Sequence, residues 1–385
     1  MTITYCTQVY FLDNAIEYVR LLASQGHSVH VLIELSPNQL KANILEIETD
    51  LNKYPALTSF KDVVGDWGLQ FLNTYFQECT SVNFVVYPNK KISSTRKVSK
   101  KLEDYITTIN PDYIHLDDFS SRTLFQLFFL FKNRRKLIAN IHDPLTHSGE
   151  FNIGREIYRK LWFHLIPSFV VFSEFSKSIL YPQLRKSKKI TVLKLMPYTV
   201  YKSFLSESSD VSRKYISFVG RISPYKGVDL FVGALEKVVE NNSKAQFYIG
   251  GKTTANYYPD FLKLKLKNLT IENKFLSNSE MSAVINKSQL IVCPYKDATQ
   301  SGVIMTAYAL GCPVLVTDTG GLPEYVIHGK TGLITIENSV EGITEGIVNF
   351  LNKNRNNLFS DNIKNRSNIN KFFNENIKAI KLLYI

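Results

Sequence analysis

A polar turn between two apolar runs is the stretch of this sequence best suited to hold an anion. The turn reads Thr299-Gln300-Ser301-Gly302-Val303 and follows an apolar, strand-like run from Leu290 to Cys293. The residues that follow have the composition of a helix, which Gly311 ends. The first N–H groups of a helix have no partner inside it, and the helix dipole is positive there. The turn is therefore a candidate phosphate site.

Two cations lie in a second glycine-flanked turn. Gly220-Arg221 and Lys226-Gly227 enclose this turn, which comes directly after an apolar run at 215–219. Arginine offers a planar fork of donors and lysine a compact point charge, and both suit a diphosphate that becomes a leaving group. Two solvated loop cations are the alternative interpretation.

Acidic and histidine side chains follow two other apolar runs. His142-Asp143 comes after Leu137 to Ile141, and Asp117-Asp118 comes after Tyr113 to Leu116. In parallel sheets, ligands bind at the carboxyl ends of the strands, so His142 lies where a ligand would bind. A lone histidine at a strand end is more often structural than catalytic, and His147 is a weaker candidate than His142. Metal sites need several convergent ligands. We therefore expect the two aspartates to be strand-end polar residues, and no metal site.

Strand-like and helix-like runs alternate along the chain, which predicts parallel α/β domains. A length of 385 residues favours two of them. The opening strand, helix and strand lack a glycine-rich loop, which argues against a dinucleotide-dependent oxidoreductase. The expected strands are 2–10, 28–33, 82–87, 113–116, 137–141, 169–172, 215–219, 247–251, 290–293 and 313–316, and the expected helices include 13–25, 260–269, 278–284, 303–310 and 363–385.

The segment Ile291 to Ile334 resembles the donor-binding core of glycosyltransferase family 4, whose members have the GT-B fold. The resemblance is to the subset that carries a T-Q-S-G-V-I motif. It rests on Pro294, Tyr295, Ala298 to Ile304, Ala307 to Ala309, Gly311, Pro313, Val314, Thr317 and Gly320 to Glu324, and on Gly220-Arg221 with Lys226-Gly227.

The resemblance implies an α/β, GT-B architecture, in which two Rossmann-like domains face each other across a cleft. Residues 1–200 would form the acceptor-side domain and 201–362 the nucleotide-sugar domain. Residues 363–385 would form a helix that crosses back to the first domain. Periodicity alone indicates only that this last helix is amphipathic.

The activity implied is transfer of a sugar from an NDP-sugar to a hydroxyl acceptor, with retention of configuration. The NDP-sugar would be a co-substrate, with no cofactor, and the pathway would assemble a bacterial surface polysaccharide or glycolipid from glycan or lipid-linked acceptors. The implied catalytic residues are His142, Arg221 and Lys226. His142 would contact the transferred sugar. The implied substrate-binding residues are Gly220, Thr299, Gln300, Ser301, Gly302, Val303 and Thr306.

One departure from the family keeps other functions open. Most members have two glutamates in this core, and the matching positions here are Ala298 and Thr306. A catalytically inactive glycan- or nucleotide-binding protein would follow if chemistry has been lost. A nucleotide-sugar epimerase or hydrolase of the same fold would need a carboxylate near His142, and Asp143 or Glu150 could serve.

Charge and cysteine content restrict partners and location. The chain carries a net charge of +12, and basic clusters lie at 89–101, 132–136 and 185–189. These clusters are either solvated surface or attract an anionic membrane face or phosphate-bearing lipid. Aromatic interleaving and recognition motifs for nucleic acid are absent, so no nucleic-acid partner is expected. Four scattered cysteines, no visible signal peptide and no long apolar run suggest a cytoplasmic protein, peripheral at the inner membrane face if the clusters bind lipid.

Overall fold

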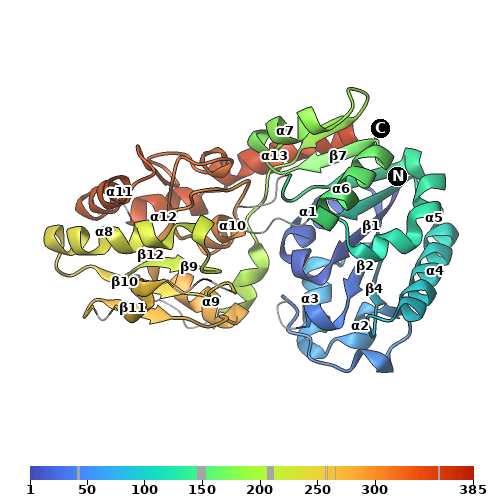
Figure 1. Ribbon diagram of the computed structural model, residues 1–385, viewed down its shortest axis with the longest axis horizontal. Helices are drawn as coiled ribbons and strands as arrows, with labels where there is room; N and C mark the ends of the chain where they lie inside the picture. Colours follow the sequence, from blue (N-terminus) through green and yellow to red (C-terminus); the bar gives the residue numbers. More distant parts are fainter. Residues whose placement is uncertain are drawn as a thin grey trace.

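The computed structural model describes residues 1–40, 44–144, 153–205, 212–255, 257, 259–264, 266–353 and 356–385; at 153–156, 356 and 366–370 it describes only the main chain. Its described residues form two sheets, each covered by helices, that lie side by side along the longest axis of the molecule (Figure 1). The predicted pair of α/β domains is therefore confirmed.

The first domain is built on an eight-stranded sheet with the order β3-β4-β2-β1-β5-β6-β7-β8. All neighbours are parallel except β3 and β4. The central strands are buried and apolar because helices cover both faces of a parallel sheet. The strands are β1 (Thr2–Gln8), β2 (Ser28–Leu35), β3 (Leu57–Ser59), β4 (Ser81–Val86), β5 (Tyr113–Asp117), β6 (Leu137–Asn140), β7 (Ser168–Val171) and β8 (Lys189–Val192).

Helix α1 (Leu12–Ser24) joins β1 to β2 and buries its apolar side in one core. Four helices pack into a second core, shared by Leu102, Leu130, Trp162 and Leu180. They are α4 (Ile92–Ile109), α5 (Leu127–Lys132), α6 (Ile153–Leu165) and α7 (Glu174–Leu180). Right-handed crossovers place these four helices on the face opposite α1, because the chain moves along the sheet in the opposite direction after β4.

Shorter helices complete the first domain. They are α2 (Phe60–Val63) and α3 (Asp66–Tyr75), with 3₁₀ turns η1 (Val9–Phe11), η2 (Pro37–Gln39), η3 (Leu51–Lys53), η4 (Ser121–Gln126), η5 (Arg134–Lys136) and η6 (Tyr181–Gln183).

The second domain has a six-stranded parallel sheet with the order β11-β10-β9-β12-β13-β14. Its strands are β9 (Tyr215–Val219), β10 (Gln246–Gly250), β11 (Leu269–Glu272), β12 (Ser288–Cys293), β13 (Val314–Val316) and β14 (Gly332–Ile334). Its helices are α8 (Val228–Asn241), α9 (Asn278–Asn286), α10 (Gly302–Ala309) and α11 (Val340–Asn352), with η7 (Thr199–Phe204), η8 (Pro224–Lys226), η9 (Asp260–Lys263) and η10 (Leu322–Tyr325).

The prediction of a helix at 260–269 is wrong. Residues Asp260–Lys263 form one 3₁₀ turn, and Leu269 already begins the edge strand β11. Pro259 precedes the turn, and the apolar side chains Phe261, Leu262 and Leu266 pack on the core without a continuous helix. Their spacing gave the apparent helical pattern.

The last two helices, α12 (Asn356–Lys364) and α13 (Arg366–Leu383), return toward the first domain (Figure 1). Helix α13 contacts β8, and Tyr384 lies in the core of the first domain beside Tyr18. No helix among the described residues has the length and apolar character needed to cross a bilayer.

Candidate functional site

The polar turn lies at the amino end of α10, as predicted. Ser301 precedes the helix with extended backbone, and its hydroxyl pairs with Tyr295 Oη at 3.2 Å instead of capping the helix. Gly302 opens the helix against the ring of Tyr198, which would lie 3.1 Å from an added Cβ. A larger residue would thus push this helix end away from its support. The first-turn N–H groups of α10 are oriented to receive an anion.

The two cationic residues lie close to this helix end. Lys226 Nζ is 3.7 Å from the centre of the Tyr295 ring, and Tyr295 in turn contacts Ser301. Gly220 has φ of 125°, and an added Cβ would lie 3.5 Å from Val303 in the first turn of α10. Arg221 donates to Tyr225 Oη at 3.0 Å. The structure therefore brings the glycine-flanked turn and the polar turn to one region of the second domain.

His142 faces this region from the first domain. Its side chain is only 6% exposed and stacks on Phe11, with ring centres 4.0 Å apart. Nε2 lies 2.8 Å from Asp117 Oδ1. Burial lowers the pKa of His142, but the hydrogen bond and charge of Asp117, together with the charges of Asp118 and Asp143, outweigh burial, and the net pKa is raised. Asp117 therefore favours the imidazolium form.

Contacts across the domain boundary join His142 to the polar turn. Gln300 Nε2 lies 3.4 Å from both His142 Nδ1 and the His142 carbonyl oxygen. Thr299 donates to Asp143 Oδ1 at 2.5 Å. Gln300 Oε1 is buried and has no hydrogen-bond partner among the residues that the structure describes. That oxygen is an acceptor available to a sugar hydroxyl, or to Nδ1–H of a protonated His142 if the amide turns over.

A cavity of about 920 Å³ lies between the domains and is lined by residues of both. The first domain contributes Tyr10 and Asp13 at the amino end of α1, and the second contributes Gly220 and Arg221. The strand-end residues Gly251 to Thr253 and the segment Phe275 to Met281 complete its second-domain wall. Its size suits a ligand as large as a nucleotide sugar.

Asp13 is the titratable group that connects this cavity to His142. Burial raises the pKa of Asp13 to about 6, and the backbone N–H of Asn14 and the charge of His142 oppose that rise. Tyr201 Oη lies 3.5 Å from its Oδ2. A carboxyl group with this pKa changes charge near neutral pH, which suits a group that receives or gives a proton.

A buried chain of hydrogen bonds leads from the C-terminal segment to His142. Burial lowers the pKa of His115 to about 4, so this ring is neutral and one of its nitrogens must accept. His115 Nε2 donates to Asn140 Oδ1 at 2.7 Å, which leaves Nδ1 to accept from Tyr384 Oη. Asn140 then donates to Asp117 Oδ1 at 2.7 Å. Every member of the chain is consistent with Asp117 as the acceptor for His142 Nε2–H.

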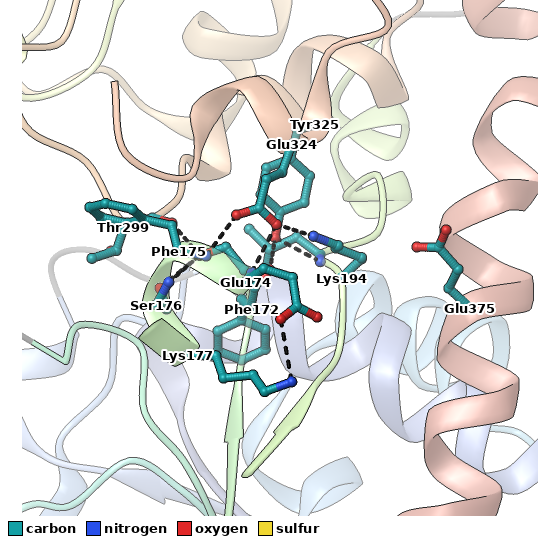
Figure 2. A network of polar contacts seen from close by, with 12 residues as sticks. Phe172, Glu174, Phe175, Ser176, Lys177, Lys194, Thr299, Glu324, Tyr325 and Glu375 are labelled. Carbon is teal, nitrogen blue, oxygen red and sulfur yellow. Dashed lines mark hydrogen bonds and ion pairs between the residues drawn. The ribbon is translucent and has the colours of Figure 1, made fainter. Parts of the chain in front are cut away.

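The carboxylate of Glu324 ties the second domain to helix α7 of the first (Figure 2). Its oxygens each lie 2.8 Å from a backbone nitrogen, of Glu174 and of Phe175, and it also pairs with Lys194. Nearby, Ser173 Oγ donates to the Thr299 carbonyl at 3.0 Å. The polar turn is therefore held against the first domain at its own backbone, close to His142.

Most of the predicted site residues lie in this region of the structure. The residues below differ from the prediction or are not described. Thr306 is buried, and its hydroxyl donates to the Gly302 carbonyl one turn earlier, so its hydrogen is not offered to a ligand. Ala298, at the other position where the family has glutamate, is also buried. His147 and Glu150 lie outside the described residues. No group of three or more metal-binding side chains occurs in the described part of the chain.

Sequence reasoning missed the roles of Asp117 and Asp13. Asp117 was expected to be a strand-end polar residue, but β5 and β6 are neighbours in the sheet, so its carboxylate meets His142 at the shared carboxyl edge. The position of both residues after apolar runs was a usable signal. Asp13 was noted only as the start of a helix, since its neighbours in the cavity come from the other domain.

Comparisons with known proteins agree with this geometry. Residues 213–353 match the family model described as "Glycosyl transferases group 1". A D-inositol 3-phosphate glycosyltransferase from Corynebacterium aurimucosum is 29% identical over 146 residues, which are 36% of this chain and 35% of that protein. The sequence match thus spans about a third of this curated relative.

Solved structures match over the whole chain at low identity. Anabaena HepE in complex with UDP-glucose aligns with a TM-score of 0.64 and 14% identity, over 100% of this chain and 99% of that one. UDP-GlcNAc 2-epimerase from Neisseria meningitidis, bound to UDP-GlcNAc, aligns with a TM-score of 0.57 and 16% identity, over 100% and 99%. These likenesses establish the fold. The chain has the GT-B fold, and its second domain is similar to glycosyl transferases group 1.

Proposed function

We propose that this protein is a retaining glycosyltransferase that moves a sugar from a nucleoside diphosphate sugar to a hydroxyl group of a glycan or lipid-linked acceptor. One observation carries the proposal. Arg221 and Gly220 of the second domain and Asp13 of the first line a single cavity that is large enough for a nucleotide sugar. The similarity of residues 213–353 to glycosyl transferases group 1 supports the donor side of the proposal.

Departure of the nucleotide is the step that the second domain assists. The bond between the anomeric carbon and the diphosphate oxygen breaks, and its electron pair stays on the diphosphate. In this proposal Arg221, Lys226 and the first N–H groups of α10 stabilise the growing charge, because donors and cations fixed in advance lower the barrier to such a step. The proposal uses no cofactor besides the nucleotide-sugar co-substrate.

The first domain holds the sugar and receives the acceptor. His142, as an imidazolium donor, and Gln300 Oε1 bind hydroxyls of the transferred sugar. The acceptor oxygen bonds to the anomeric carbon and loses its proton, and Asp13 is our candidate for the group that takes it. Its pKa of about 6 leaves it ionised at neutral pH and able to exchange a proton.

We further propose that the reaction takes part in the assembly of a bacterial surface polysaccharide or glycolipid. The name of the curated relative, D-inositol 3-phosphate glycosyltransferase, gives an acceptor for that protein and not for this chain. The acceptor of this chain is therefore proposed only by class, as a glycan or lipid-linked hydroxyl.

A donor screen tests the proposal. Thermal unfolding of the wild type would be followed with UDP-, GDP- and ADP-sugars, together with release of the nucleoside diphosphate. We expect one nucleotide class to raise the Tm of the wild type and to do so much less for Arg221→Ala. Lys267→Ala is a matched control, because Lys267 is an exposed cation of the same domain that does not line the cavity.

Two outcomes would argue against transfer. Donor turnover that is independent of any acceptor would favour a nucleotide-sugar epimerase or hydrolase, for which Asp13 or Asp143 would be the carboxylate. Binding of a donor with no turnover under any acceptor would favour a catalytically inactive nucleotide-binding protein. If no nucleotide sugar raises the Tm of the wild type, the proposed donor site is contradicted.

A further inference from the structure

The outer side of helix α5 exposes large apolar residues. Phe128 is 71% exposed and Phe131 is 52% exposed, and Leu124 in the preceding turn η4 is also exposed. These residues are four and three positions apart, so they lie along one side of a helix. The opposite side, represented by Leu130, is fully buried in the core of the first domain. These three outward residues are not among the described apolar side chains that pack on the two cores.

Helix α6 extends this apolar surface. Ile157 is 67% exposed, and Leu161, one turn later, is exposed on the same side. Beneath the surface, the segment that leads into η4 and α5 contacts α6, because Phe119 stacks on Trp162 at 5.1 Å and Tyr158 donates to the Ser120 carbonyl. The crossovers described above place α5 and α6 on the same face of the sheet of the first domain. We call Leu124, Phe128, Phe131, Ile157 and Leu161 the α5–α6 face.

Positive charge lies beside the two exposed phenyl rings of this face. Lys132 Nζ lies 4.6 Å from the centre of the Phe128 ring, and the Arg134 guanidinium lies 4.8 Å from that of Phe131. Arg135 is exposed beside them, and no acidic residue occurs between Leu124 and Lys136. Helix α4, on which η4 packs, adds the exposed Arg96, Lys97 and Lys101.

Exposed aromatic side chains with cations stacked on them suit the interface between a membrane and water. A membrane–water interface offers apolar chains to the phenyl rings and anionic phosphates to the cations within a few ångströms. Clusters of lysine and arginine are attracted to anionic lipid in particular. We propose that the α5–α6 face docks the protein on an anionic lipid bilayer, with Phe128 and Phe131 inserted at the headgroup level.

The position of the face suits a substrate held in a membrane. The segment that carries it begins at the carboxyl end of β5, where Asp117 pairs with His142, and continues through η4 into α5. Leu124 is therefore only seven residues from the candidate site along the chain. Docking itself does not depend on the proposed transfer reaction, so the two can be tested separately.

Co-flotation with lipid vesicles tests the proposal on the full chain. Vesicles of phosphatidylcholine alone would be compared with vesicles that also contain phosphatidylglycerol, at low and high salt. We expect the wild type to float with the anionic vesicles and to be released as salt rises. Binding to the neutral vesicles should be far weaker.

Two variants separate the apolar and the charged contributions. Phe128→Ser with Phe131→Ser should weaken binding at least tenfold, because both rings then have nothing to insert. Lys132→Gln with Arg134→Gln and Arg135→Gln should weaken binding to anionic vesicles roughly 100-fold. Ile336→Ser with Leu358→Ser, and Lys244→Gln with Lys267→Gln and Lys353→Gln, are matched exposed controls on the other side of the molecule and should float like the wild type.

Several results would overturn the proposal. The wild type could fail to float with anionic vesicles, could float equally with both vesicle types, or could lose binding equally in the control variants. Sedimentation velocity provides a further check. The wild type could be a dimer that does not bind vesicles, and Phe128→Ser with Phe131→Ser could convert it to a monomer. The α5–α6 face would then be an interface between two copies of this chain and not a membrane-docking surface. Donor binding measured on the same variants shows whether the proposed function stands when docking fails.

Discussion

Asp13 and His142 are two ionisable side chains of the candidate site, and burial and neighbouring charges have opposing effects on the pKa of each. Burial disfavours the charged form of each, yet the carboxylate of Asp117 keeps the pKa of His142 raised. Among the described residues, the hydrogen-bond partners of Asp13 are the Asn14 N–H and the Tyr201 hydroxyl, and burial raises its pKa to about 6. A group held in an unfavourable charge state is more typical of a functional site than of a structural one.

This argument predicts that Asp13→Asn stabilises the protein while it lowers activity. The folded-state pKa of about 6 lies above the ordinary value of 3.8, so Asp13 contributes stability below pH 4 and loses that contribution as the pH rises through 6. The rise corresponds to roughly 2 to 3 kcal/mol. At pH 7.5 the free energy of unfolding of Asp13→Asn should therefore exceed that of the wild type by up to this amount. Denaturant titrations between pH 4 and 7.5 would measure it.

The difference between the two proteins should vanish at the acidic end of that range, where both side chains are neutral. An exposed carboxylate supplies the control: Asp104→Asn, on the surface of α4, should show no such pH-dependent gain. A constant or absent difference for Asp13→Asn would mean that its carboxyl group is not buried in the charged form.

The sequence predicted the residues of the site that lie in local motifs. Arg221, Lys226 and the turn at Ser301 are each placed by a strand-to-helix connection, which leaves a local pattern. Asp117 and Asp13 have no such pattern toward their partners, because sheet order and domain packing decide which carboxyl groups meet His142. The sequence also did not indicate that the Thr306 hydroxyl donates to the Gly302 carbonyl one helical turn earlier.

At the scale of elements, the contact between η10 and helix α7 predicts a strong effect at Glu324. Glu324→Gln keeps the size of the side chain but removes its charge and one of its acceptor oxygens. The backbone N–H groups of Glu174 and Phe175 and the Lys194 ammonium then share one acceptor. We expect the free energy of unfolding to fall by about 1–3 kcal/mol and donor affinity to fall with it.

The control for this change is Glu341→Gln, which breaks an exposed ion pair with Lys237 in the second domain. Exposed pairs contribute little, so both quantities should stay close to those of the wild type. Equal effects of the two substitutions would show that Glu324 does not hold the domains together.

The elements themselves were largely predictable where they are long and apolar. The central strands β1, β2, β5, β9 and β12 and the helix α1 follow clear apolar patterns, and all were expected within a few residues. The short edge strands β3, β8, β11 and β14 were missed, because three or four residues at a sheet edge carry little pattern and are recognised only by their neighbours.

At the scale of the whole molecule, the candidate site exists only because two domains face each other. In our proposal the second domain supplies cations and the amino end of α10 for a diphosphate, and the first supplies His142 and Asp13 for the sugar and the acceptor. Helix α13 and the Glu324 contact hold these halves together at the boundary. Because the two domains have different proposed roles, we expect substitutions in the second domain to change donor binding and substitutions in the first domain to change kcat.

The most direct test compares Arg221→Ala and His142→Gln by steady-state kinetics and donor binding, with the donor found in the screen and its acceptor. We predict that Arg221→Ala weakens donor binding. We predict that His142→Gln binds the donor nearly as the wild type does but lowers kcat by roughly 100-fold or more. If His142→Gln retains the kcat of the wild type, or Arg221→Ala binds the donor unchanged, the two-domain site proposed for this protein is contradicted.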